Sequence, residues 1–362
     1  MLHVLCSNLH TEVSGMPFKV SDSFTRENQV VAVLSGGTEA KFVELVREKK
    51  IDLKRPVYLL VSEFSNSLPA ALEILSFIRQ RNGIAKIMQY AKDTIFPEQN
   101  ETDSLTREPL DKVLKNDKKL RLGVVGKSSD WLIASQVNYK EVLKAMNCEL
   151  IDIPFTELSS LGEVDPGMKG AEAVYERLKE IVTKNQLDGI TFRCFELFTT
   201  VKNTGCLAIS KLQDFGIPAA CEGDIPVLLT MMVCKKLTGE PGFMGNPARI
   251  TPEGKILLAK CTIPLSMTEK HEFTKHFESG LGVAIHGEVP EGDYTLVKLS
   301  QDMKRLLAVN VTVTGCQYEQ NMCRTQIWIQ STPIVSQYLL TAPLSNHHVL
   351  IKGHHAAKFW RE

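Results

Sequence analysis

The fold is decided by the stretch VYLLVSEFSNSLPAALEILSFI, residues 57–78. Its first five residues are apolar, as in a buried strand, and the polar residues 65–67 favour a turn. Apolar residues then recur at the spacing of a helix. A similar unit precedes it, with an apolar strand over 29–34, a turn over 35–38 and a helix over 39–49. Consecutive strand–turn–helix units predict a parallel sheet with helices on its faces.

A second series of such units begins after the polar segment 100–119, which we interpret as a surface connection between two lobes. The expected strands are 120–125, 149–153 and 189–194, and the expected helices are 139–146, 170–185, 203–215 and 225–237. After Gly239 the chain is broken by glycines and prolines, and short alternating segments replace the helical ones. These short segments predict an antiparallel sheet or a small barrel.

The expected fold class is therefore α/β, with two doubly wound parallel-sheet lobes followed by a β-rich third lobe. A chain of 362 residues is long enough for two or three domains. We expect an N-terminal α/β lobe over 1–118, a second α/β lobe over 119–240 and the β-rich lobe over 241–362.

Composition excludes several classes of protein. The 42 basic residues balance 42 acidic ones, so no overall field would attract nucleic acid or an anionic membrane. No apolar run approaches the roughly 18 residues of a membrane span, and the first twenty residues lack a signal-peptide pattern. Nine cysteines without a C-x-x-C pair are typical of reduced thiols. We expect a cytoplasmic protein that binds neither nucleic acid nor membrane.

Three carboxylates are candidates for chemistry. Glu196 follows the strand 189–194 among three phenylalanines, and a carboxylate in apolar surroundings should be paired, protonated or bound to a metal. Glu222 and Asp224 directly precede the apolar helix expected from residue 225. Asp224 is well placed to cap that helix. A helix needs only one N-cap residue, so capping by Asp224 leaves the presence of Glu222 unexplained.

Four of the nine histidines lie within nine residues, as the pairs His347-His348 and His354-His355. The strand-like residues 349–351 between them would carry one pair towards the other. Neutral imidazoles join carboxylates at divalent-metal sites, although a histidine cluster alone is more often a surface feature.

Gly126-Lys127-Ser128 invites comparison with a phosphate-binding loop, but Arg121 stands where that motif needs a glycine, so a nucleotide site is disfavoured. Trp131, just beyond this turn, is placed either to stack on a sugar face or to pack within the fold.

The combination resembles the L-fucose and L-arabinose isomerase superfamily, in particular its shorter fucose-isomerase-like members. Residues 221–224, CEGD, and residues 237–244, LTGEPGFM, are similar to the E-G-D and T-G…F-M segments of those enzymes. Glu196 lies at close to the right distance upstream to match a metal-binding glutamate. Gly353-His354-His355 is similar to the small-residue-His-His motif that supplies a late histidine ligand. The likeness extends from about Lys54 to Lys358.

The resemblance implies a metal-dependent aldose–ketose isomerase that binds Mn²⁺ or another divalent cation, works as a homo-oligomer and acts on a free monosaccharide through a cis-enediol. It assigns Glu196, Glu222 and His355 as metal ligands, and the two glutamates also as acid and base. Asp224 and His354 are second choices for these roles, and Trp131 is a candidate substrate platform.

One departure from the superfamily pattern leaves an alternative open. Ile250 stands where arabinose isomerases have a histidine ligand. A non-catalytic sugar-binding or sugar-sensing relative of the same fold is therefore the alternative function.

Overall fold

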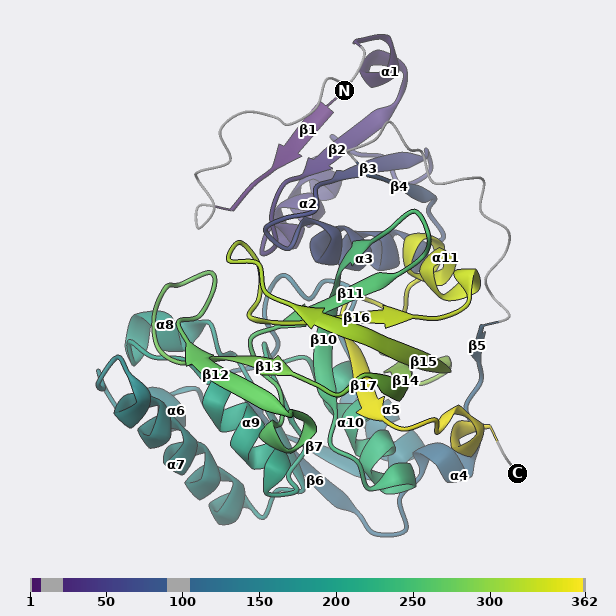
Figure 1. Cartoon of the computed structure of the whole chain (residues 1–362). Coiled ribbons are helices and arrows are strands. Elements are labelled where there is room, and N and C mark those ends of the chain that lie inside the picture. The colour runs from purple at the N-terminus through teal and green to yellow at the C-terminus, as the bar shows by residue number, and fades with distance from the viewer. Residues whose placement is uncertain (1, 8–21, 90–104, 361–362) are drawn as a thin grey trace.

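The computed structural model describes residues 2–7, 22–89 and 105–360. They form two parallel four-stranded sheets and one closed antiparallel barrel, with helices packed between and around them (Figure 1). The expected class, two parallel α/β lobes with a β-rich lobe, is confirmed.

The N-terminal sheet has the strand order β1-β2-β3-β4, all parallel. Its middle strands are almost wholly apolar and buried, as expected for a sheet covered by helices. Helix α3 buries every residue from Ser67 to Ile78, because it lies between this sheet and the barrel strand β10. The elements are β1 (Leu2–Leu5), α1 (Asp22–Glu27), β2 (Gln29–Val33), α2 (Glu39–Arg47), β3 (Val57–Val61), α3 (Ser67–Arg79) and β4 (Ala85–Gln89).

The second parallel sheet has the order β7-β6-β8-β9. Helix α10 is apolar around most of its circumference because it lies between this sheet and the barrel strands β14 and β17. The elements are α4 (Asp111–Leu114), β6 (Leu120–Val125), α5 (Tyr139–Met146), β7 (Cys148–Ile153), α6 (Thr156–Ser159), α7 (Met168–Asn185), β8 (Gly189–Phe192), α8 (Glu196–Thr200), α9 (Cys206–Asp214), β9 (Ala219–Ala220) and α10 (Ile225–Thr238).

The β-rich part is a barrel of the order β14-β17-β10-β11-β16-β15, closed because β14 also pairs with β15. Beside it lies the hairpin β12–β13. The elements are β10 (Phe243–Ile250), β11 (Ile256–Lys260), η3 (Leu265–Met267), β12 (Lys270–Thr274), β13 (Ala284–Glu288), β14 (Gly292–Leu299), β15 (Leu306–Gln317), β16 (Thr325–Gln330), α11 (Pro333–Thr341), β17 (His348–Lys352) and η4 (Ala356–Phe359).

Two segments differ from expectation. The polar segment 100–119 is more than a surface connection. Its first residues lie outside the described ranges, but β5 (Thr106–Arg107) pairs with β15, and Thr106 is buried beside Arg305. Strand β10 crosses the region in which Pro247 predicted a break. The strand tolerates this proline because its pairing with β11 shifts register between Pro247 and Arg249.

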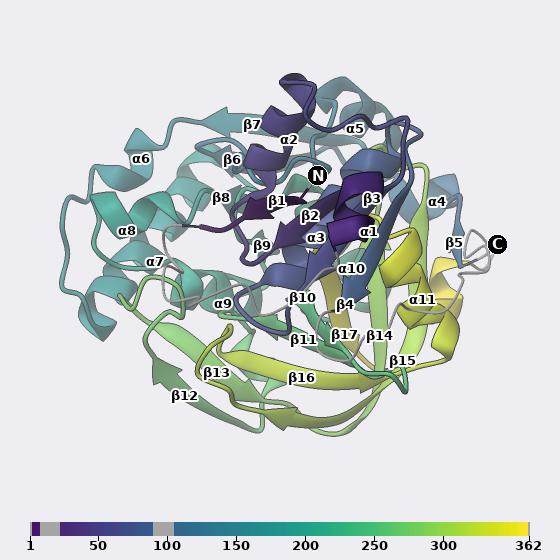
Figure 2. The same cartoon turned by 90° about the horizontal axis from the view of Figure 1, so that it is seen from above.

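The three sheets share their cores and meet around one cavity. The N-terminal sheet and the barrel contribute to one apolar cluster, and the second sheet and the barrel contribute to another. Seen from above, the barrel strands lie on one side of the molecule and the second parallel sheet on the other (Figure 2). Residues that follow β2, β3 and β9 line the cavity together with barrel residues. It therefore lies beyond the carboxyl ends of parallel strands, where α/β folds bind ligands.

None of the helices in the described ranges combines the length and apolarity needed to cross a lipid bilayer.

Candidate active site

The turn that carries Glu222 and Asp224 follows β9 and is held against the turn after β6. Glu222 and Gly223 both have left-handed backbones, with φ of 64° and 68°. A Cβ atom on Gly223 would lie 2.4 Å from the carbonyl oxygen of Lys127, so only glycine fits there. The Ser129 amide donates to the Glu222 carbonyl (3.1 Å), and the Ser128 hydroxyl donates to the Gly223 carbonyl (2.8 Å). The turn 126–128 thus has a structural role here.

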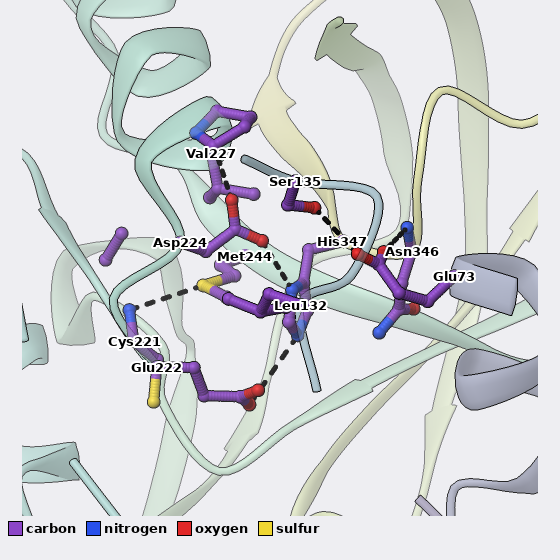
Figure 3. A network of polar contacts seen from close by, with 12 residues as sticks. Glu73, Leu132, Ser135, Cys221, Glu222, Asp224, Val227, Met244, Asn346 and His347 are labelled. Carbon is purple, nitrogen blue, oxygen red and sulfur yellow. Dashed lines mark hydrogen bonds and ion pairs between the residues drawn. The ribbon is translucent and has the colours of Figure 1, made fainter. Parts of the chain in front are cut away.

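Asp224 is the N-cap of α10, as predicted. Its Oδ1 accepts a hydrogen bond from the Val227 amide (2.9 Å), and its Oδ2 lies 2.8 Å from Nδ1 of His347. Burial opposes ionisation of Asp224, but Lys298 and His347 offset this and lower the pKa of its carboxyl. Asp224 therefore joins the helix start to His347 (Figure 3).

Glu222 lies on the cavity wall with both carboxylate oxygens in use. Trp131 Nε1 donates to Oε2 (2.7 Å), and the ammonium of Lys260 donates to Oε1. Nε2 of His347 lies 3.6 Å from the same Oε1. Burial would raise the pKa of Glu222, but Lys260 and then His347 outweigh it and hold the pKa well below its usual value. Glu222 is an ionised carboxylate.

Lys260 connects Glu222 to His347. Its side chain is buried, with Nζ 2.9 Å from His347 Nε2. Because Nδ1 of His347 faces the Asp224 carboxylate, that nitrogen carries the proton, and Nε2 accepts from the ammonium. Burial lowers the pKa of Lys260, but the contact with Glu222 raises it well above the usual value. The result is a chain of contacts from Asp224 through His347 and Lys260 to Glu222 and Trp131.

A second carboxyl group, Glu39, reaches the cavity from the N-terminal lobe. It begins α2, is only 4% exposed and lines the cavity. Its Oε2 has no hydrogen-bond partner among the residues the structure describes. Burial, aided by the nearby charges of Glu73 and Glu222, raises the pKa of Glu39 well above its usual value. The surroundings of the cavity therefore favour ionisation of Glu222 and oppose ionisation of Glu39.

Glu73 of α3 fixes the segment that carries His347. Its Oε1 accepts from the Ala134 amide (2.8 Å) and the Ser135 hydroxyl (3.1 Å), and its Oε2 accepts from the Asn346 amide (3.2 Å) (Figure 3). The N-terminal lobe thus positions a residue next to His347.

Part of the cavity lining is rich in sulfur. Cys206, Cys221, Cys261 and Cys323 line the cavity with His276. Burial would raise the pKa of the Cys261 thiol, but the Cys323 thiol and the His276 ring hold it well below its usual value. The contact with Cys261 in turn raises the pKa of His276, although burial opposes this.

The structure brings together only some of the predicted residues. Trp131 and Glu222 line the cavity, with Asp224 behind them. The Glu196 side chain is 41% exposed, lies 2.7 Å from Arg193 Nε and is not part of the lining.

The late histidines that matter at this cavity are those of the other pair. His354 lies 3.3 Å from the Val311 carbonyl, and the His355 amide donates to Thr295, both away from the lining residues. His347 lines the cavity, and His348 is buried behind it against Tyr338 (3.1 Å). Ile250 is a core residue of β10, 2% exposed.

Lys260 and Glu39 were not identified as candidates from the sequence, for two different reasons. Lys260 interrupts the apolar run 256–261, and a lysine inside a buried strand is a signal that could have been used. Glu39 looks like an ordinary acidic residue in the first turn of a helix, which is common on exposed helices.

As arranged, these residues do not fit the manganese ion that the resemblance implies. Both oxygens of Glu222, both oxygens of Asp224 and both nitrogens of His347 already have partners, and a lysine ammonium lies between Glu222 and His347. Within the described ranges, no group of three or more His, Cys, Asp or Glu side chains is placed to hold a metal ion.

Part of the chain is similar to a known sugar isomerase. No protein-family model matches the chain. A stretch of 78 residues, 21% of this chain, is 31% identical to sulfoquinovose isomerase from Clostridium sp. (strain MSTE9), and it covers 17% of that protein. The similarity is thus to a sugar isomerase over a fifth of the chain, and the wider resemblance to fucose and arabinose isomerases stays a prediction.

Proposed function

We propose that the cavity is the active site of an aldose–ketose isomerase that acts on a free monosaccharide through a cis-enediol. The observation that carries the proposal is the contact of Glu222, Lys260 and His347 on the wall of a cavity that Glu39 also lines. The similarity to a sugar isomerase supports the same reaction class.

The reaction moves a proton between two adjacent carbons. A base takes the proton from C2 of the open-chain aldose while an acid protonates O1, which gives the enediol. The acid, which has given its proton to O1, then takes the O2 proton, and the protonated base delivers its proton to C1, which gives the ketose and restores both groups. Two carboxyl groups whose surroundings favour opposite ionisation states suit these steps. Glu222 serves as the base and Glu39 as the acid.

Lys260 has two roles in this scheme. Its ammonium can donate to the oxygen on which charge develops and so stabilise an enediolate in a site shielded from water. A sugar oxygen that takes one of its hydrogen bonds would also loosen its contact with Glu222, which makes that carboxylate more basic.

The alternative is a sugar-binding protein without catalysis. The burial of Ile250 in the core favours it, because that position adds no polar group to the cavity. Sugar binding without any turnover would support this alternative.

The first test is Glu222→Gln, assayed against free aldoses and ketoses that include sulfoquinovose, fucose and arabinose. We expect turnover to fall by roughly 10² to 10⁴-fold, because an amide cannot accept the proton. Since the substitution leaves Lys260 buried without a carboxylate, folding is checked by circular dichroism. The double variant Glu222→Gln/Lys260→Gln restores neutrality and should fold but stay inactive.

A matched control separates this site from the residues suggested by resemblance. Glu196→Gln should keep activity, since Glu196 pairs with Arg193 outside the cavity. If Glu196→Gln were inactive and Glu222→Gln active, the base would be Glu196. Turnover in heavy water should place deuterium on C1 or C2 of the product, and its absence would favour a hydride shift over the enediol.

A further inference from the structure

We infer that the Lys260 ammonium is the resident cation of this site and occupies the place between Glu222 and His347 that a divalent metal ion would need. The inference deepens the proposed function and relies on it only for the location of the site. The binding experiment below uses no sugar, so it can fail or succeed independently of catalysis.

The geometry of the contacts carries the inference. Lys260 ends β11, is 5% exposed and is held at the cavity by the strand pairs β10–β11 and β11–β16. Its Nζ contacts Glu222 Oε1 and lies 2.9 Å from His347 Nε2, while those two acceptor atoms are 3.6 Å apart. A carboxylate oxygen and an imidazole nitrogen are the ligands that manganese takes from proteins. Here one ammonium bridges them.

Charge gives the second argument. Glu222 has Lys260 as its buried cation, and the negative charge of Asp224 is offset by the buried Lys298 and by His347. Burial raises the pKa of Glu39 and so opposes a further negative charge at the cavity. A divalent ion placed beside Lys260 would bring two further positive charges, whereas the carboxylates of Glu222 and Asp224 already have buried partners, and unmatched buried charge is strongly unfavourable.

The decisive measurement is the binding of Mn²⁺ in the absence of sugar. Binding is detected as a loss of the electron paramagnetic resonance signal of free Mn²⁺ when protein is added. We expect the wild-type chain to leave the signal of free Mn²⁺ unchanged. Lys260→Ala and Lys260→Gln free Glu222 Oε1 and His347 Nε2, so both should bind Mn²⁺ at least about tenfold more tightly than the weakest binding the assay can detect, a difference of about 1.4 kcal/mol.

Two control variants test the position and the charge of the lysine. Lys260→Arg keeps a cation at the site and should bind no Mn²⁺. Lys298→Met removes a buried lysine whose charge acts on Asp224 and Glu73 and which does not lie between Glu222 and His347. This variant should bind no more Mn²⁺ than the wild type. Circular dichroism confirms that each variant is folded.

Two outcomes would overturn the inference. One is wild-type protein that binds a divalent ion stoichiometrically, since Lys260 would then not exclude it. The other is a failure of both folded variants, Lys260→Ala and Lys260→Gln, to gain Mn²⁺ binding, because removing the ammonium would then expose no site. Any wild-type turnover should also persist in a chelator.

Discussion

Glu39 shows the cost of burying an acid beside a cavity. Its carboxyl group loses its hydration on folding, one of its oxygens, Oε2, has no hydrogen-bond partner among the described residues, and the group resists ionisation. Such a group reduces stability at neutral pH, where an unfolded chain would ionise it freely. The loss of stability is offset by a gain in function if the neutral Glu39 carboxyl group donates a proton to a ligand.

We therefore expect Glu39→Gln to be more stable than the wild type at pH 7 by roughly 0.5–2 kcal/mol. The folded-state pKa lies above the usual 4.5, so the unfolded chain binds fewer protons between the two pKa values. Wild-type stability consequently falls as pH rises through this window, and glutamine removes that dependence. Urea unfolding at several pH values measures the effect.

The exposed Glu48, at the end of the same helix, provides a control. Glu48→Gln should change neither stability nor its pH dependence. A Glu39→Gln variant that is less stable than the wild type at pH 7 would show that the carboxyl has a stabilising partner.

Among the elements, the α/β units could be predicted because their signals are local. Helix α7 follows directly from its periodicity, and strand β3 follows from an unbroken apolar run. Strand β10 could not be predicted from the sequence, because Pro247 breaks the local pattern. Only pairing with β11 and β17 makes this segment a strand. Helix α11 and the short β5 likewise depend on neighbours distant in sequence.

The candidate site was predictable only in part for the same reason. Glu222 stood out because the cap role of Asp224 did not explain it, and Trp131 because it follows a strand end. The role of His347 depends on Asp224, 123 residues away, and on Lys260, 87 residues away, and no sequence spacing encodes such contacts. The resemblance pointed to His355 and His354, whereas the histidine that lines the cavity is His347.

At the element scale, the turn between β9 and α10 should be sensitive to one methyl group. Gly223→Ala would combine a left-handed backbone with a clash against the Lys127 carbonyl, so we expect a loss of more than about 2 kcal/mol in the free energy of unfolding. Chemical unfolding measures it. Activity should also fall, since Glu222 precedes Gly223.

Gly239, at the other end of α10, isolates the contribution of the clash. It has a similar φ of 78°, but nothing lies within 4 Å of a Cβ atom built there. Gly239→Ala should therefore cost only about 1 kcal/mol. Equal losses in the two variants would mean that the contact with Lys127 is unimportant.

At the scale of the whole molecule, we expect the chain to self-associate. Large apolar side chains remain exposed on several elements, among them Phe64, Ile84, Phe215 and Phe273. Such surface is commonly covered in oligomers. Light scattering at micromolar concentration should give a mass above the 40.4 kDa of one chain. A monomer at that concentration would contradict the expectation, and Phe215→Ser should leave the mass unchanged if Phe215 lies outside the interface.

The central position of β17 in the barrel has a consequence for how the protein folds during its synthesis. This strand lies between β14 and β10, both of which precede it in the chain. Until the ribosome has delivered β17, two strands have open edges, and such edges favour aggregation. His347, directly before β17, arrives at the same moment. Glu39, Glu222 and Lys260 are therefore all synthesised before the residue that completes their group.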